Sequence, residues 1–158
     1  MVLAVTIALC SCNRKTIYHH YEHTSLAGWE KSDTIVFCVP PVPQSTVLHE
    51  EVELRISDHY PFMGLSLVVE HTTLPAGTTP KAGKALPAGL VRTDTLNCSL
   101  VDENGNFKVK GVGYYQYHFH LTDISVNGGD SLVVALRHAM RRETLPGIAD
   151  VGIKLHVY

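Results

Sequence analysis

The sequence predicts an all-β protein built as an antiparallel β-sandwich of about seven strands. Short segments in which apolar and polar residues alternate recur along the chain, and turn-forming residues separate them. We find no convincing segment with the 3.6-residue periodicity of an amphipathic helix. An open β-barrel would produce the same alternation and is the alternative architecture.

The composition fits one folded domain. The chain has 158 residues, of which 45% are hydrophobic and 18% are charged. A chain of this length can fold without a metal or a disulfide framework, so any cofactor has to be argued from particular residues. No residues indicate one, and we expect no cofactor and no small-molecule ligand. The net charge is -2, and the positive charges are scattered apart from Arg141 and Arg142. Nucleic acid is therefore not an expected partner, because its binding needs a basic stripe.

The first eleven residues have the character of an export signal. Residues 1–10 form an uncharged apolar run that has the length of a signal-peptide core and is too short to span a bilayer. The run ends in Leu9-Cys10-Ser11-Cys12, which resembles the bacterial lipobox. No Lys or Arg precedes the run, and a buried N-terminal strand is the alternative interpretation. We predict that residues 1–11 are a signal peptide and that Cys12 carries the lipid.

The residues after Cys12 are polar and weakly patterned up to residue 33. We predict that residues 12–33 are the lipidated N-terminus and a tether, and that residues 34–158 form the β-sandwich. Each buried methylene of a lipid contributes about 0.8 kcal/mol, so several acyl chains on Cys12 would hold the domain stably at a membrane. The expected location is the cell envelope, either facing the periplasm or at the outer membrane.

Strand character recurs through the predicted domain. The expected strands cover residues 34–39, 47–57, 62–72, 91–102, 111–122, 131–140 and 151–157. We expect the second and third to form a hairpin, and the turn at Asn104-Gly105 to return the chain after the fourth. Residues 74–90 are rich in Pro, Gly and Ala and predict a long loop.

Alternation in the second strand assigns its two faces. Val52, Leu54 and Ile56 are expected in the core, whereas Glu51, Glu53 and Arg55 are expected on a solvent-exposed face.

Two cysteines lie within predicted strands. Cys38 and Cys98 could form a disulfide, because disulfides persist in an exported protein. Two separate buried thiols are the other interpretation, since free cysteine behaves as a small core residue.

We do not predict an enzyme. The chain has no nucleophile elbow, zincin, phosphate-loop or Cys-x-x-Cys motif.

His118 and His120 share one face of a predicted strand and are the candidate metal ligands. The sequence does not identify a third ligand, so no metal site is predicted. Aromatic residues between Tyr114 and Phe119 could bind a sugar. A surface module that binds glycan or metal is therefore the alternative function.

The segment AMRRETLPGIADVGI at residues 139–153 resembles the GldH family of gliding-motility lipoproteins of the Bacteroidetes. Further similarities occur in the same order at Trp29, Tyr60-Pro61, Asp102, Gly105, Phe107, Gly111 and Gly113. The resemblance implies a non-enzymatic envelope lipoprotein, anchored through Cys12, that is a structural or assembly component of the gliding machinery and its associated secretion. Its partners would be other envelope proteins of that machinery.

The most specific part of this segment also predicts a turn. Leu145-Pro146-Gly147-Ile148 should join the last two strands, because proline fixes φ and glycine permits a positive φ. We further hypothesise that this corner presents a docking surface for a partner. The residues of that surface would be Arg141, Arg142, Leu145, Pro146 and Gly147.

Overall fold

The computed structural model describes residues 15–78 and 89–158 and consists of strands joined by turns and loops. The predicted signal peptide and Cys12 lie outside the described residues. The strands are β1 (Lys15–His23), β2 (Trp29–Glu30), β3 (Ile35–Val39), β4 (Thr46–Ser57), β5 (Gly64–Leu74), β6 (Leu90–Ser99), β7 (Tyr114–Val126), β8 (Ser131–His138), β9 (Thr144–Leu145) and β10 (Ile148–Val157). Within these two described stretches there is no helix with the length and hydrophobicity needed to cross a bilayer.

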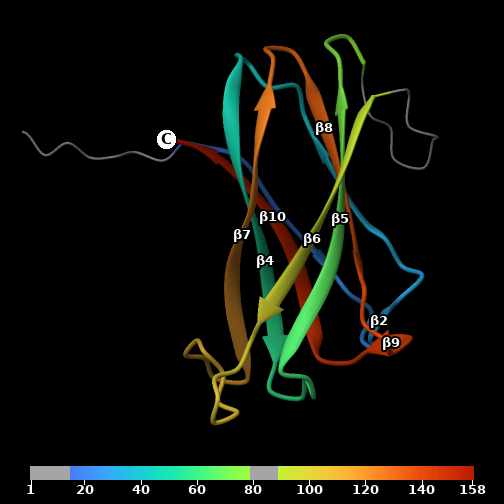
Figure 1. The fold of residues 1–158 in the computed structure, drawn as a ribbon, viewed down its shortest axis with the longest axis vertical. Coiled ribbons are helices and arrows are strands. Elements are labelled where there is room, and N and C mark those ends of the chain that lie inside the picture. The colour runs from blue at the N-terminus through green and yellow to red at the C-terminus, as the bar shows by residue number, and fades with distance from the viewer. Residues whose placement is uncertain (1–14, 79–88) are drawn as a thin grey trace, which may run out of the picture.

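The strands form two layers that face each other (Figure 1). Sheet I has four strands in the order β1-β10-β4-β7, and sheet II has four in the order β3-β8-β5-β6. The short pair β2-β9 lies at one end of the molecule. Neighbouring strands within each sheet are antiparallel. The predicted β-sandwich is confirmed, and the alternative barrel is wrong because the two sheets are not closed on each other.

The core consists of apolar side chains from the inner faces of both sheets. Its largest fully buried members are Trp29, Phe37, Leu48, Leu54, Ile56, Leu65, Leu67, Leu74, Leu100, Leu132, Leu136 and Leu145. As predicted, Val52, Leu54 and Ile56 of β4 all point into this core. Burial of this apolar surface makes the main favourable contribution to the free energy of folding.

Strand β1 corrects the predicted tether. Residues 15–23 pair with β10 in sheet I, and Trp29 is 1% exposed in the core. The prediction that residues 12–33 link the anchor to the domain is therefore wrong for residues 15–30. Most side chains of β1 are polar or exposed, so its apolar pattern is weak. The strand forms because β10 supplies hydrogen-bond partners for its backbone.

The connections differ from those predicted. Strand β4 lies in sheet I and β5 in sheet II, so the expected hairpin between them is wrong. The Asn104-Gly105 turn exists, with a φ of 81° at Gly105, but it leads from β6 in sheet II to β7 in sheet I. Among the described strands, β5 and β6 are the consecutive pair that lie side by side within one sheet. Alternation shows which face of a strand is buried, but not which strand is its neighbour.

The disulfide interpretation is also wrong. Cys38 and Cys98 are both free, and they lie on β3 and β6 at opposite edges of sheet II. Two strands separate them, which at about 4.8 Å per strand is far beyond the reach of a disulfide. Cys98 is a buried thiol whose burial raises its pKa to about 12, and Cys38 is half-buried.

The Leu145–Ile148 segment forms a corner rather than a hairpin. Leu145 is fully buried and pairs with Trp29 of β2, and β10 begins at Ile148. Gly147 has a φ of 82°, and the Ser57 N–H donates to its carbonyl at 2.7 Å. A Cβ at position 147 would lie 2.7 Å from the backbone nitrogen of Tyr60. The corner therefore requires glycine for two reasons, its φ and its close approach to another backbone segment.

A Gly147→Ala variant should separate these two reasons when it is compared with Gly113→Ala. Gly113 has a φ of 74°, but nothing lies within 4 Å of the place that a Cβ would take there, so alanine at this position should cost about 1–2 kcal/mol. Alanine at Gly147 should cost roughly 1–3 kcal/mol more, because of the added clash with Tyr60. Urea denaturation of both variants measures the difference, and equal losses would contradict the role of the close contact.

Candidate functional site

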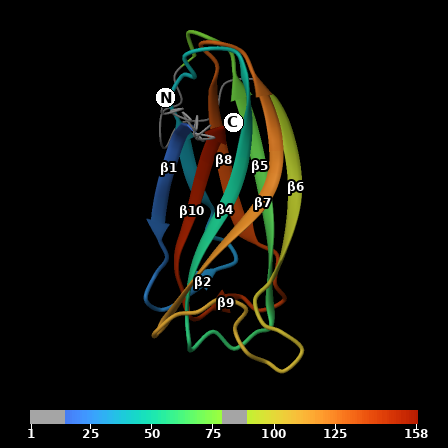
Figure 2. The same cartoon turned by 90° about the vertical axis from the view of Figure 1, so that its left-hand side faces the viewer.

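Polar side chains gather on the outer face of sheet I, which faces the viewer in Figure 2. One row of paired residues crosses all four strands, from Tyr21 on β1 through Gly152 and Glu53 to His118 on β7. The next row along the strands contains His19, Lys154, Glu51 and His120. We name the side chains around Glu53, namely His19, Tyr21, Glu51, Gln116 and His118, the Glu53 cluster.

Glu53 is the centre of this cluster and is 1% exposed. Its Oε2 atom accepts hydrogen bonds from the Tyr21 hydroxyl and, at 2.9 Å, from His19 Nε2. Its Oε1 atom lies 3.0 Å from His118 Nδ1. Gln116 Nε2 donates to the Tyr21 hydroxyl oxygen at 2.9 Å and so holds that group from the other side. Strands β1 and β7 thus supply groups that converge on one carboxylate of β4.

Gly152 makes this convergence possible. It lies on β10 between Tyr21 and Glu53, and a Cβ there would lie 2.6 Å from the Tyr21 ring. Because this position has no side chain, the tyrosine ring passes over β10 and reaches β4. An aromatic ring that covers a glycine on a neighbouring strand is a known device of β-sheets.

Opposing effects act on the pKa of the Glu53 carboxyl. Burial raises that pKa, but the hydrogen bonds from Tyr21 and His19 and the charge of His118 together lower it by more, so the net pKa is below its ordinary value. The pKa of Tyr21 is raised, first by burial and then by its hydrogen bond to Glu53. Both directions favour an ionised carboxylate that accepts a hydrogen bond from a neutral tyrosine.

Glu53 corrects the predicted solvent-exposed face of β4. Glu51 and Arg55 do lie on the outer face and are partly accessible, as expected. Glu53 points to the same side, but side chains from β1 and β7 cover it. Alternation therefore identified the face correctly, but it could not show that neighbouring strands bury one carboxylate on that face.

The two candidate metal ligands separate in the structure. His118 contacts Glu53, whereas His120 Nε2 lies 3.6 Å from Asp123 Oδ1 in its own strand. The residues that meet His118 are Glu51 and Glu53, and the ligand atoms of these three side chains lie within 4.8 Å of one another. Sequence analysis missed this group because the pairing of β4 with β7 brings it together.

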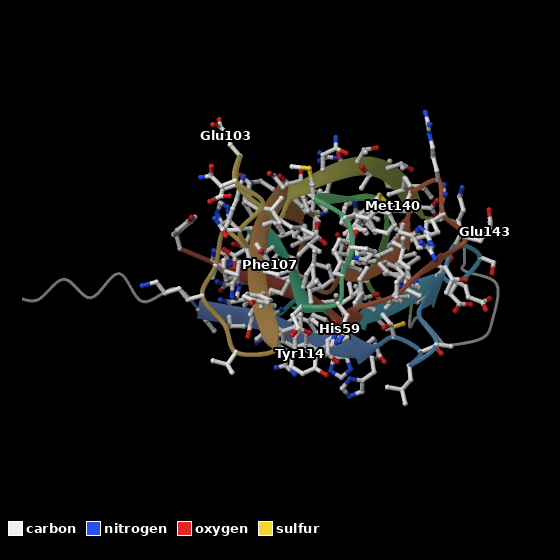
Figure 3. All side chains as sticks on the ribbon, turned by 90° about the horizontal axis from the view of Figure 1, so that it is seen from below. His59, Glu103, Phe107, Tyr114, Met140 and Glu143 are labelled. Atoms are coloured by element: carbon white, nitrogen blue, oxygen red, sulfur yellow. The ribbon has the colours of Figure 1, made fainter. Side chains whose placement is uncertain are left out.

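An open pocket lies at the corner formed by Pro146 and Gly147, and Arg55, the strand partner of Gln116 in the Glu53 cluster, is part of its lining. Its volume is about 920 Å³. It is lined by residues 23–26, Arg55, Ser57, His59, Tyr114 and residues 146–150. His59 and Tyr114 lie close together at this end of the molecule (Figure 3). Within the pocket, Asp150 accepts a hydrogen bond from Arg55 at 3.0 Å and also contacts His23.

The structure divides the predicted docking surface. Pro146 and Gly147 line the pocket, but Leu145 is fully buried and cannot contact a partner, so its assignment to the surface is wrong. Arg141 and Arg142 are exposed. Their chain neighbours Met140 and Glu143 lie away from His59 and Tyr114 in Figure 3. The arginines and the pocket are therefore separate surfaces.

The aromatic residues of β7 do not form an exposed strip. Tyr114 is 56% exposed, but Tyr117 is 3% exposed and its ring stacks on Phe119. Tyr115 stacks on Phe107 with ring centroids 3.9 Å apart and packs against the core. Most of these rings thus serve packing, which removes the observation that favoured glycan binding.

A second buried pair of ionisable side chains lies between the sheets. Glu50 of β4 and His71 of β5 are 0% and 2% exposed, and His71 Nε2 lies 2.6 Å from Glu50 Oε2. His71 Nδ1 is also 3.5 Å from Asp94 Oδ2, and Arg92 Nε is 2.9 Å from that same oxygen. This network links the two sheets, because Glu50 belongs to sheet I and His71 to sheet II. Sequence analysis missed it because it treated β4 and β5 as neighbours in one sheet.

A Tyr21→Phe variant should be about 1.5–3 kcal/mol less stable than the natural protein at neutral pH, because it removes a hydrogen bond to a buried carboxylate. The folded-state pKa of Glu53 is below its ordinary value of 4.5, so this stabilisation is present above pH 4.5. It is lost as the pH falls through the lower, folded-state value, and the difference between variant and natural protein should shrink there.

Urea denaturation at a series of pH values measures this difference. Tyr114→Phe, which alters an exposed ring, is the control and should have little effect. A penalty for Tyr21→Phe that stays constant as Glu53 is protonated would contradict the proposed hydrogen bond.

Comparison with solved structures shows a distant likeness in shape. A CocE/NonD family hydrolase from Staphylococcus aureus superposes with a TM-score of 0.44 at 10% sequence identity. The matched region covers 91% of this chain and 34% of that chain, so this chain spans about a third of the hydrolase's length.

Comparison of sequences shows a relationship that extends over nearly the whole chain. The gliding motility lipoprotein GldH of Flavobacterium johnsoniae is 25% identical over 164 residues, which cover 98% of this chain and 93% of the relative. The model of the GldH lipoprotein family matches residues 16–155, which include all of β1 except Lys15 and most of β10. This chain therefore belongs to the GldH lipoprotein family.

Proposed function

We propose that this chain is a non-enzymatic, lipid-anchored protein of the cell envelope that serves as a structural or assembly component of gliding machinery and its associated secretion. The family match over residues 16–155 is the observation that carries this proposal. The lipobox-like sequence ending at Cys12 supports the anchor, and the relative in Flavobacterium johnsoniae is named for gliding motility.

The position of β1 gives the proposed anchor a geometric consequence. Cys12 is three residues before Lys15, where β1 begins, and three extended residues span at most roughly 11 Å. Lipid on Cys12 would therefore hold the Lys15 end of the sandwich close to the membrane surface. We propose that the domain is attached directly, without a long tether.

With the anchor at Cys12, the corner pocket would lie away from the membrane. Strand β1 runs nine residues to His23, a rise of roughly 26 Å, and His23 lines the pocket. The corner at Pro146 and Gly147 would then face the periplasm or the surroundings of the envelope, where a partner protein can reach it. This supports the docking role proposed for that end of the molecule.

The proposed anchor predicts the behaviour of a Cys12→Ala variant. Natural protein from washed membranes should have the mass of residues 12–158 plus acyl chains, whereas the variant should lack the acyl mass and leave the membrane fraction. Intact-mass spectrometry and cell fractionation measure both properties. Cys38→Ala is the matched control, because Cys38 lies within the folded domain, and it should keep both the lipid and the membrane attachment.

An unmodified, soluble natural chain would contradict the anchor. Family membership would stand in that case, because it depends on residues 16–155 and not on Cys12.

The exposed arginine pair predicts a separate effect on partner binding. Replacing Arg141 and Arg142 with alanine should leave the melting temperature within about 1 °C, since surface changes cost little stability. The double variant should recover at least several-fold less of the envelope proteins that cross-link to the natural protein in membranes. Arg137→Ala, an exposed change on β8, is the control. Unchanged recovery with the double variant would contradict a docking role for the pair.

A further inference from the structure

We propose that Glu51, Glu53 and His118 form a binding site for a divalent transition-metal ion, and that Zn²⁺ is the ion whose chemistry fits it best. The site lies on the outer face of sheet I and joins β4 to β7. It goes beyond the proposed envelope role and does not depend on it.

The spacing of the three side chains matches metal coordination. One ligand atom from each lies within 4.8 Å of the other two. Glu53 Oε1 and His118 Nδ1 are 3.0 Å apart. Two ligands that are each about 2.1 Å from a tetrahedral Zn²⁺ ion are separated by about 3.4 Å, so these two atoms would have to move apart by about 0.4 Å. The ion could therefore be held between these atoms with little movement of the strands.

The second oxygen of Glu53 is already held in the manner of a metal ligand. Tyr21 and His19 both donate hydrogen bonds to Oε2, and Gln116 in turn contacts the Tyr21 hydroxyl. Such outer contacts fix the orientation of a coordinating carboxylate, and the ion would take the place of the proton between its other oxygen and His118 Nδ1. Oε1, the atom that faces His118, is that other oxygen.

Exposure provides a route for the ion. The Glu53 side chain is 1% exposed, that of Glu51 is 19% exposed and that of His118 is 49% exposed. An ion can approach from solvent beside His118 and bind against the buried carboxylate. The two carboxylates give the site negative charge that a divalent cation would neutralise.

One positive charge opposes binding. Lys154 Nζ lies 3.7 Å from Glu51 Oε2, a distance longer than a hydrogen bond, and its side chain is 30% exposed. The bound ion would replace Lys154 as the partner of Glu51, and the lysine can turn to solvent. Removing Lys154 should therefore increase the affinity for the metal.

The ligand types select the ion. An imidazole nitrogen suits Zn²⁺ and other first-row transition ions, whereas Ca²⁺ and Mg²⁺ prefer oxygen ligands alone. Three protein ligands would leave at least one coordination position for water. We therefore expect Zn²⁺ to bind and Ca²⁺ to compete poorly.

Calorimetric titration of the chelator-treated full chain in detergent with ZnCl₂ tests the site. We expect one ion per chain, a melting temperature that rises with Zn²⁺ concentration, and no comparable response to CaCl₂. His118→Gln and Glu51→Gln should each weaken binding at least tenfold while the circular dichroism spectrum stays unchanged. Lys154→Met should bind Zn²⁺ severalfold more tightly.

His120→Gln is the matched control, because His120 neighbours His118 on the same face of β7 but contacts Asp123 instead. It should bind Zn²⁺ as the natural protein does. The proposal is overturned by the absence of saturable binding, by equal losses in His118→Gln and His120→Gln, by equal responses to Ca²⁺ and Zn²⁺, or by weaker binding in Lys154→Met.

Discussion

The pairing of β10 with β1 on one side and β4 on the other holds sheet I together, and the Glu53 cluster depends on it. The strand comes from the end of the described chain, and its apolar residues Val151, Ile153 and Leu155 are fully buried in the core. Because β1 and β10 are far apart in the sequence, sheet I cannot be completed by local contacts. Such non-local pairing makes folding slow compared with that of helical proteins of similar size.

Within this sheet, Gly152 of β10 allows the contact between Tyr21 and the buried Glu53 carboxylate. Its missing side chain lets Tyr21 cross the strand and bind Glu53, which His19 and His118 also contact. A charged group can remain buried when its hydrogen bonds are satisfied, and here two flanking strands supply the partners. The same arrangement that stabilises the carboxylate places it beside Glu51 and His118, where a metal ion could bind.

The proposed lipid on Cys12 and the corner at Gly147 would give the domain two functionally different ends. The start of β1 is beside the end of β10, while His23 at the other end of β1 lines the corner pocket. A sandwich attached by its Lys15 end would present the corner and the Arg141-Arg142 surface at positions set by rigid strands rather than by a flexible linker. Loops that a rigid scaffold holds in this way are common sites of binding in proteins.

The sequence by itself determined the sandwich class, most strand positions, the inward residues of β4 and the family, because alternation, turn residues and a specific C-terminal motif are local properties. Tertiary structure decided which strands are neighbours, and therefore that β1 belongs to the domain and that Cys38 and Cys98 stay apart. It also decided the burial of Glu53 and its meeting with His118. A strand's pattern specifies its buried face but not its partner, so groups contributed by several strands become visible only when the sheets are assembled.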